Sequence, residues 1–131
     1  SAEERTENLR RAGEAARLFF EQGCIVLCTF VSPFAADRQR VRRLFPLGSF
    51  LEVHVRASVE TCAGRDPKGL YARAARGKLA GLTGVNAAYE APAAPEVVAD
   101  TEVAGVEEIV AAIMRRLREE RVLPEASTPE V

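Results

Sequence analysis

The chain has 131 residues, which suits one domain built around one core. Apolar residues make up 47% of the chain and charged residues 28%, a composition typical of globular proteins. The formal net charge is −1, so no overall positive field favours nucleic acid or an anionic membrane. The longest mostly apolar run, residues 24–31, is too short to span a bilayer. Residues 1–11 are charged and polar and do not resemble a signal peptide, so we expect a cytoplasmic protein.

The three cysteines predict neither a disulfide framework nor a metal site. Cys24, Cys28 and Cys62 are odd in number and include no CxxC pair. Cys24 and Cys28 lie in an apolar run, where cysteine usually behaves as a small buried hydrophobe. We therefore expect reduced, buried cysteines, as in a reducing cytoplasm, and no metal ligands in this chain.

The start of the chain predicts a helix that is followed by a strand. Ser1 and Glu4 form a capping-box pattern, and apolar residues then recur at helical spacing to about residue 21. Residues 24–30 are apolar on both alternating faces, which is typical of a fully buried parallel strand. The same reasoning predicts helices at 35–45, 58–63, 70–76 and 106–121, strands at 50–55 and 96–100, and an irregular connection at 77–95.

The alternation of strands and helices predicts an α/β fold with three layers, in which helices cover both faces of a parallel sheet. Ligands of such sheets bind beyond the carboxyl ends of the strands. Because the first helix has no strand before it, we expect an N-terminal strand to be missing from this chain. Residues 1–123 are predicted to form one domain, and residues 124–131 a tail or linker.

Three polar residues could line a ligand site. Arg5 and Asn8 share one face of the first helix, where a guanidinium could hold an anion and an amide could pair with the edge of a base or sugar. Ser32 follows the predicted buried strand directly, at the edge of the sheet where ligands bind. The alternatives are two exposed helix residues and a turn serine, which spacing alone favours.

A basic, glycine-containing stretch follows the second predicted strand. It suits a lid that closes over phosphates, or else a solvated basic helix. Gly64 and Gly69 are spaced like the outer glycines of a phosphate-binding loop, but Leu70-Tyr71 stands where Lys-Ser/Thr is required. No stretch of the 131 residues satisfies G-x-x-x-x-G-K-[ST]. The basic residues of this stretch are Arg65, Lys68, Arg73, Arg76 and Lys78.

Taken together, four segments resemble the adenylylsulfate (APS) kinase family over nearly the whole chain. The most specific is the string RDPKGLY, residues 65–71. The segments, in order, are 5–11 with 14–19, 29–34 with 37–38, 65–71 with 73–74, and 82–85 with 89–92 and 95–97.

This resemblance implies a P-loop NTPase-like fold and a specific reaction. The γ-phosphoryl group of ATP, accompanied by Mg²⁺, would be transferred to the 3′-hydroxyl of APS to form PAPS. Arg65 and Lys68 would belong to the lid over ATP. The position of Ser32 is a phosphoserine or active-site position in some members, and we favour a positioning role, because in-line transfer needs no enzyme nucleophile. The residues implied to bind APS are Arg5, Asn8, Val31, Ser32, Pro33 and Leu82.

The chain also departs from the family pattern. The P-loop normally precedes the position of Ser1, and Leu82 replaces a phenylalanine that stacks on the adenine of APS. Ala35, Ala75 and Ala80 stand where basic residues are frequent.

We therefore carry two hypotheses. In the first, the parent protein is an active APS kinase, for which analogy with the family suggests a homodimer, or it is the kinase domain of a bifunctional PAPS synthetase fused to an ATP sulfurylase domain. In the second, it is a catalytically degenerate relative that binds nucleotide in a regulatory or structural role. Under both, the 131 residues alone are expected to be inactive.

Overall fold

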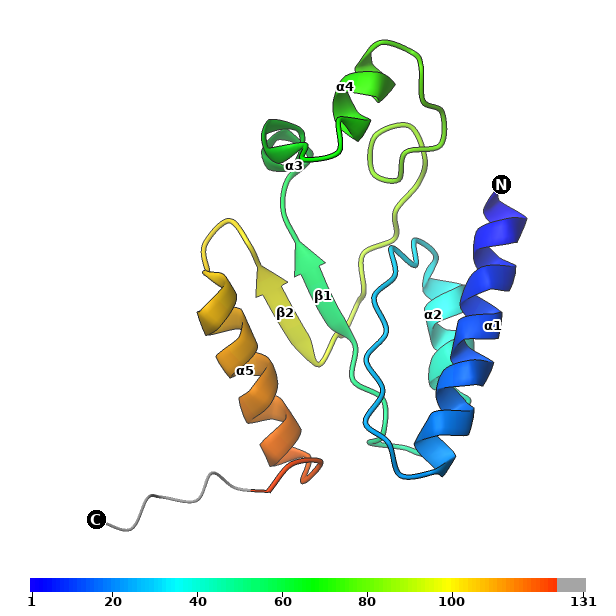
Figure 1. Cartoon of the computed structure of the whole chain (residues 1–131), viewed down its shortest axis with the longest axis vertical. Helices are drawn as coiled ribbons and strands as arrows, with labels where there is room; N and C mark the ends of the chain where they lie inside the picture. Colours follow the sequence, from blue (N-terminus) through cyan, green and yellow to red (C-terminus); the bar gives the residue numbers. More distant parts are fainter. Residues whose placement is uncertain (125–131) are drawn as a thin grey trace. The chain divides into compact units, whose positions relative to one another are not determined.

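The computed structural model describes residues 1–124, so all of the predicted tail, residues 124–131, except its first residue lies outside the described residues. The chain divides into two compact units (Figure 1). The first unit contains Ser1–Phe50 and Val59–Pro92, and the second contains Leu51–Ser58 and the chain from Ala93 onward. No helix within residues 1–124 has both the length and the apolar content needed to cross a bilayer.

The first unit is helical. It contains α1 (Ala2–Glu21), α2 (Ala35–Arg42), α3 (Val59–Arg65) and α4 (Leu70–Ala75). The capping box predicted at the start of α1 is present, because the Ser1 hydroxyl accepts a hydrogen bond from the Glu4 amide at 3.2 Å and the Glu4 side chain bonds back to Ser1. Helix α2 ends three residues earlier than predicted, at Arg42.

Helices α1 and α2 pack closely at a glycine. Gly13 is buried, and a Cβ atom built there would lie 3.0 Å from a methyl carbon of Val41. Glycine therefore permits a close approach of the two helices that a larger residue would oppose. At the far end of α1, the rings of Phe20 and Phe45 meet edge to face with centroids 5.5 Å apart.

The strand predicted at residues 24–30 is absent. Residues 24–34 form no helix or strand, and residues 21–31 are all exposed, Leu27 to 87%. The prediction of buried cysteines fails with it, because Cys24 and Cys28 are also exposed. A strand needs neighbours that pair with its amides and carbonyls, and within residues 1–124 no strand pairs with this segment. An apolar run indicates a preference for burial but does not supply the strand to pair with.

The second unit contains a small parallel sheet. Strands β1 (Val53–Arg56) and β2 (Val97–Asp100) pair in register from Val53 with Val97 to Arg56 with Asp100. Ala99 is almost fully buried, at 1% exposed. Helix α5 (Val106–Glu119) contacts β2 and lies beside it in Figure 1. Two of the three predicted strands are thus confirmed, in the parallel orientation that was expected.

Candidate functional site

The residues predicted to bind APS or ATP all lie in the first unit, on three kinds of segment. The first turns of α1 carry one group, the Ser32-Pro33 turn carries the second, and the connections around α4 carry the third. In chain order they are Arg5, Asn8, Val31, Ser32, Pro33, Arg65, Lys68 and Leu82.

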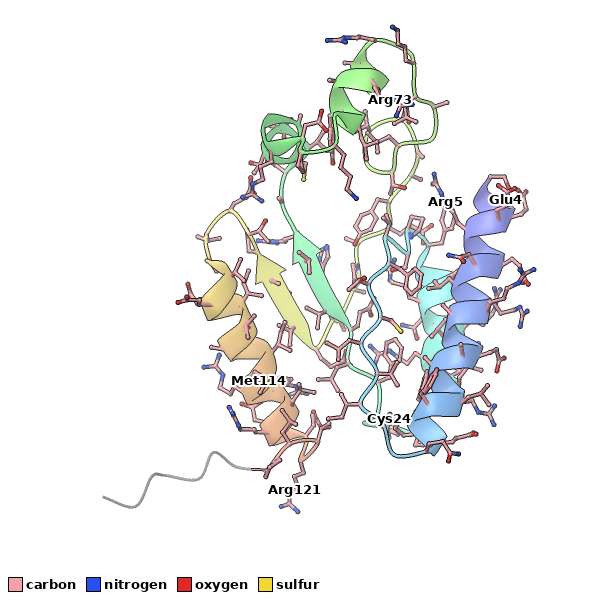
Figure 2. The ribbon with its side chains drawn as sticks, in the orientation of Figure 1. Glu4, Arg5, Cys24, Arg73, Met114 and Arg121 are labelled. Carbon is pink, nitrogen blue, oxygen red and sulfur yellow. The ribbon has the colours of Figure 1, made fainter. Side chains whose placement is uncertain are left out.

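Arg5 joins α1 to the irregular loop that contains Leu82. Its guanidinium donates one hydrogen bond to the carbonyl of Gly81 at 2.5 Å and another to the hydroxyl of Thr83 at 3.2 Å. Arg5 is exposed and lies near the start of α1 (Figure 2). Two segments predicted to contact APS, more than seventy residues apart in the chain, therefore meet at this side chain.

Asn86 holds the loop around Leu82 in shape. Its side-chain oxygen accepts from the Leu82 amide at 2.6 Å, and its side-chain nitrogen donates to the Leu79 carbonyl at 3.0 Å. Gly81 and Gly84 both adopt positive φ, at 73° and 83°, which glycine does at little cost. The connection predicted as irregular is thus an ordered loop, and the backbone at Leu82 is fixed.

Restoring an aromatic ring at Leu82 should tighten APS binding. An aromatic side chain that stacks on a base contributes about 1–3 kcal/mol, whereas leucine offers only apolar contact. We expect Leu82→Phe in the full-length protein to lower the Kd for APS about three- to tenfold, measured by calorimetry, with the Kd for ATP unchanged. Leu79→Phe, which adds the same ring elsewhere in the loop, is the control. An unchanged Kd in Leu82→Phe would remove position 82 from the adenine site.

Asn8 lies one turn beyond Arg5 on α1. It is exposed and lines a shallow surface depression together with Glu3, Glu4, Glu7 and Arg11. Three carboxylates beside it make that depression unsuitable for the phosphate or sulfate of a nucleotide. A role for Asn8 in APS binding therefore has to involve its amide and a neutral edge of the ligand.

A strained turn carries Ser32 and Pro33. Ser32 has a φ of 37°, in a region that residues other than glycine rarely adopt. Pro33 is buried, and its carbonyl accepts from the Glu90 amide at 2.8 Å. The carbonyl of Ser32 accepts from Arg38 at 2.8 Å. This turn is therefore held in an unusual conformation by contacts on both sides.

Arg65 is the last residue of α3 and Lys68 lies in the turn between α3 and α4, and both are exposed. Asp66 fixes this turn, because its carboxylate accepts from the amides of Tyr71 and Ala72 at 3.1 and 3.0 Å. The same backbone hydrogen bonds, that from Ala72 first, lower the pKa of Asp66. That Arg65 and Lys68 share one ligand site with Arg5 and Ser32 stays a prediction.

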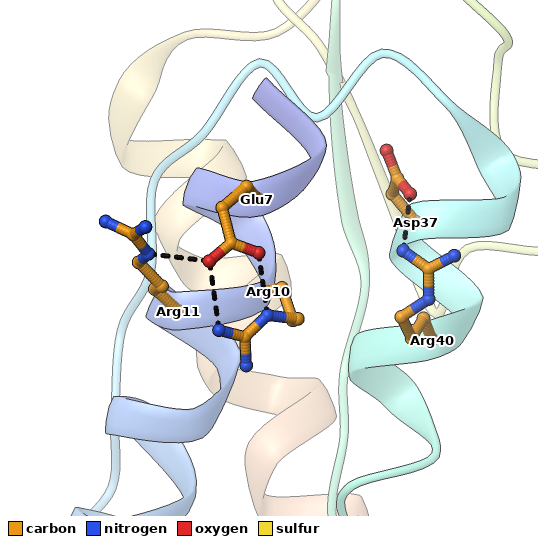
Figure 3. A network of polar contacts seen from close by, with 5 residues as sticks. All are labelled: Glu7, Arg10, Arg11, Asp37 and Arg40. Atoms are coloured by element: carbon orange, nitrogen blue, oxygen red, sulfur yellow. Dashed lines mark hydrogen bonds and ion pairs between the residues drawn. The ribbon is translucent and has the colours of Figure 1, made fainter. Parts of the chain in front are cut away.

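The outer face of α1 carries a separate ionic cluster, which Figure 3 shows. Glu7 accepts from Arg10 at 2.8 Å and from Arg11 at 2.7 Å. The hydrogen bond from Arg10 and then that from Arg11 lower the pKa of Glu7 to about 2. The three side chains are 43% to 72% exposed to solvent, so salt should screen the cluster.

The Glu7 cluster predicts how stability depends on pH. Because the pKa of Glu7 is lower in the folded chain than the ordinary 4.5, its contribution is complete above the ordinary value and is lost as the pH falls toward 2. We expect Glu7→Gln to lower the unfolding temperature at pH 6, with a smaller difference from the parent at pH 3 and in high salt. Glu14→Gln, on the same helix, is the control. An equal difference at both pH values would contradict this prediction.

Among residues 1–124, no group of three or more histidine, cysteine, aspartate or glutamate side chains is placed to hold a metal ion. Arg38, Asp37, Glu90 and Asn86, which shape the candidate site, had no role in the sequence-based prediction. The only signal was that three of them stand inside the segments that resemble the family.

The fold is similar to that of a solved kinase. The solved structure of the Mycobacterium tuberculosis APS kinase CysC, in complex with AMPPNP and APS, superposes with a TM-score of 0.80 at 31% identity. The superposition covers 90% of this chain and 69% of that one. The predicted α/β class, with a P-loop NTPase-like fold, is thereby confirmed.

The sequence comparisons narrow this class to one family. The family model for adenylylsulphate kinase matches residues 1–100. The chain is 51% identical over 115 residues to an adenylyl-sulfate kinase of Geotalea uraniireducens, covering 88% of this chain and 55% of the relative. It is 45% identical over 123 residues to that of Marinobacter nauticus, covering 94% and 62%. The chain belongs to the adenylylsulphate kinase family, and it spans between half and two thirds of the length of these relatives.

Proposed function

We propose that the parent protein is an adenylylsulfate kinase, a phosphotransferase that moves the γ-phosphoryl group of ATP to the 3′-hydroxyl of APS and forms PAPS in sulfate activation. The observation that carries the proposal is the meeting of α1 and the Leu82 loop at Arg5. These are two of the segments that the family resemblance assigns to APS, and the Mycobacterium tuberculosis relative binds APS.

The roles of this chain's residues follow from the demands of phosphoryl transfer, which depends on positioning and charge neutralisation. Arg5 would anchor the acceptor nucleotide with its guanidinium, and Asn8 and the Val31-Ser32-Pro33 turn would orient it. Leu82 would contact the adenine. Arg65 and Lys68 would cover the charge of the donor phosphates. Ser32 would position the acceptor without forming a covalent intermediate.

The kinase reaction implies Mg²⁺ with ATP, because the metal neutralises charge on the β- and γ-phosphates. Mg²⁺ bound to nucleotides is usually held by phosphates, waters and one or two carboxylates. The described residues 1–124 do not form a metal cage of their own, and we assign none of them to the ion.

The direct test is PAPS formation from ATP and APS by the full-length protein. We expect PAPS to appear only when both nucleotides are present. An intact G-x-x-x-x-G-K-[ST] segment in the encoding gene would support the proposal. Loss of that segment, together with an absence of PAPS, would overturn it.

A second candidate function is a non-catalytic nucleotide-binding domain. Leu82 favours this alternative, because it stands in an ordered loop without the aromatic ring that would stack on APS. The two candidates differ in one measurement. A full-length protein that binds ATP and APS in calorimetry but forms no PAPS would be the non-catalytic relative.

The proposal also covers the cellular location, the oligomeric state and the domain organisation of the protein. We place it in the cytoplasm, as residues 1–123 of a kinase domain that acts alone, as a homodimer, or fused to an ATP sulfurylase domain. The support for these points is the family resemblance alone. Light scattering on the full-length protein tests the homodimer, and the length of the encoding gene tests the fusion.

A further inference from the structure

Helix α2 carries two consecutive charged residues that are buried. Asp37 is 7% exposed and Arg38 is 8% exposed. Charged side chains are rarely buried unless they are paired, and burying a charge costs desolvation that its contacts often do no more than offset. Stability alone therefore does not explain why these two charges are buried. The groups that they bind indicate a role in positioning.

Arg38 binds both sides of the Ser32-Pro33 turn. One end of its guanidinium donates to the Ser32 carbonyl at 2.8 Å, and another donates to the Glu90 carbonyl at 2.7 Å. The Glu90 amide donates to the Pro33 carbonyl at 2.8 Å, and the Glu90 carboxylate accepts from the Ala35 amide at 2.6 Å. The planar fork of arginine suits such a two-carbonyl contact, which lysine, with one ammonium group, reproduces only in part.

Asp37 binds the other predicted APS segment. One of its carboxylate oxygens accepts from the Thr6 hydroxyl at 2.6 Å, and the other accepts from Arg40 at 3.1 Å. Thr6 lies in the first turns of α1, between Arg5 and Asn8. Figure 3 shows the Asp37–Arg40 pair on α2. Neighbouring residues on a helix point in directions about 100° apart, so the two side chains reach two different segments.

We propose that Asp37 and Arg38 are positioning residues that set the spacing between the first turns of α1 and the Ser32-Pro33 turn, so that both can contact one APS molecule. This inference rests on the proposed function. Arg38 holds the turn that carries Ser32, and Asp37 holds the helix that carries Arg5 and Asn8. Because both side chains are buried, they would act through the segments that they hold. The cost of burying two charges is offset by the accuracy with which two separate segments are placed.

The test uses the full-length protein and measures the Kd of APS, the Kd of ATP and the KM of each. Arg38→Met keeps the side-chain volume and removes every donor. We expect it to raise the Kd and KM for APS about tenfold and to change those for ATP less than twofold. Arg38→Lys should recover part of the loss. Arg43→Met, an exposed position at the end of α2, is the matched control and should behave as the parent.

The role of Asp37 is tested by Thr6→Val, which keeps the shape of Thr6 and removes only the hydroxyl that Asp37 binds. We expect a rise of about threefold in the Kd for APS, with ATP unaffected. If Arg38→Met does not fold, Arg38→Lys and Thr6→Val report the same difference between APS and ATP.

Three outcomes would overturn the inference. A lower unfolding temperature with an unchanged Kd for APS would make the two residues purely structural. An equal rise in the Kd values for APS and ATP would indicate a general disturbance of the fold. If the parent protein binds no APS at all, the proposed function fails and the inference fails with it. A parent that binds APS without forming PAPS overturns only the proposed activity, and the Kd values still decide the inference.

Discussion

Replacing Arg5 with alanine in the full-length protein is expected to raise the Kd for APS about ten- to a hundredfold. A hydrogen bond to a charged group contributes about 1.5–3 kcal/mol, and Arg5 is the predicted anchor for the anionic part of APS. The change also frees the Gly81 carbonyl and the Thr83 hydroxyl, which Arg5 holds, so the Leu82 loop loses a support. Calorimetric titration with APS measures the effect, and the Kd for ATP should stay constant.

Two control variants separate these contributions. Arg11→Ala removes an arginine from the same helix that pairs with Glu7 and is 72% exposed, so it should leave the Kd for APS unchanged. Thr83→Val removes one loop contact but no charge, and should raise the Kd less than threefold. If Arg5→Ala binds APS as the parent does, Arg5 does not belong to the site.

The 131-residue chain by itself is expected to form no PAPS from ATP and APS, whereas the full-length protein forms it. None of its segments satisfies G-x-x-x-x-G-K-[ST], and backbone amides of such a loop normally hold the β- and γ-phosphates. Because phosphoryl transfer depends on positioned phosphates, the loss should be complete rather than partial. Coupled detection of ADP release with APS present and absent is the measurement.

The control for this experiment is the folded state of the fragment. Far-ultraviolet circular dichroism should show the helical content that α1 and α5 supply before an absence of turnover is interpreted. APS-dependent release of ADP by the folded fragment would contradict the prediction, since it would mean that residues in this chain hold the ATP phosphates.

Local sequence signals predicted most of the secondary structure well. The capping box of Ser1 and Glu4 located the start of α1, and the glycine at residue 23, with a φ of 82°, follows its end. The helical spacing of apolar residues located α5 within about two residues. These signals act within one turn or one helix face, so they require no knowledge of the rest of the chain.

The prediction for residues 24–30 was wrong because a strand depends on distant partners. The apolar pattern of this segment suits a buried strand, but pairing is decided by whichever backbone lies on either side. Residues 53–56 and 97–100 pair with each other in a parallel ladder. Residues 24–30 have no such partner within residues 1–124, and their side chains are consequently exposed.

In the candidate site, too, local features could be predicted from the sequence and long-range contacts could not. Arg5, Ser32 and Leu82 could be named from motifs in the sequence, because each stands in a recognisable string. The side-chain contacts that shape the site could not be predicted from the sequence. Arg38 reaches Glu90 across 52 positions and Thr6 reaches Asp37 across 31. No periodicity or spacing rule predicts which of the several arginines in α2 turns inward.

The conformation of Ser32 shows a balance between stability and use. A positive φ costs a residue with a Cβ atom about 1–2 kcal/mol relative to glycine, and Ser32 has a φ of 37°. Selection for stability alone would favour glycine at this position, as engineering for heat resistance would. Under the proposed function, serine at this position places a hydroxyl group at one fixed point of the site, with a buried arginine holding its carbonyl, at a cost in stability. Stabilised forms of this protein should therefore be sought by changes elsewhere, such as the exposed faces of α1 and α5.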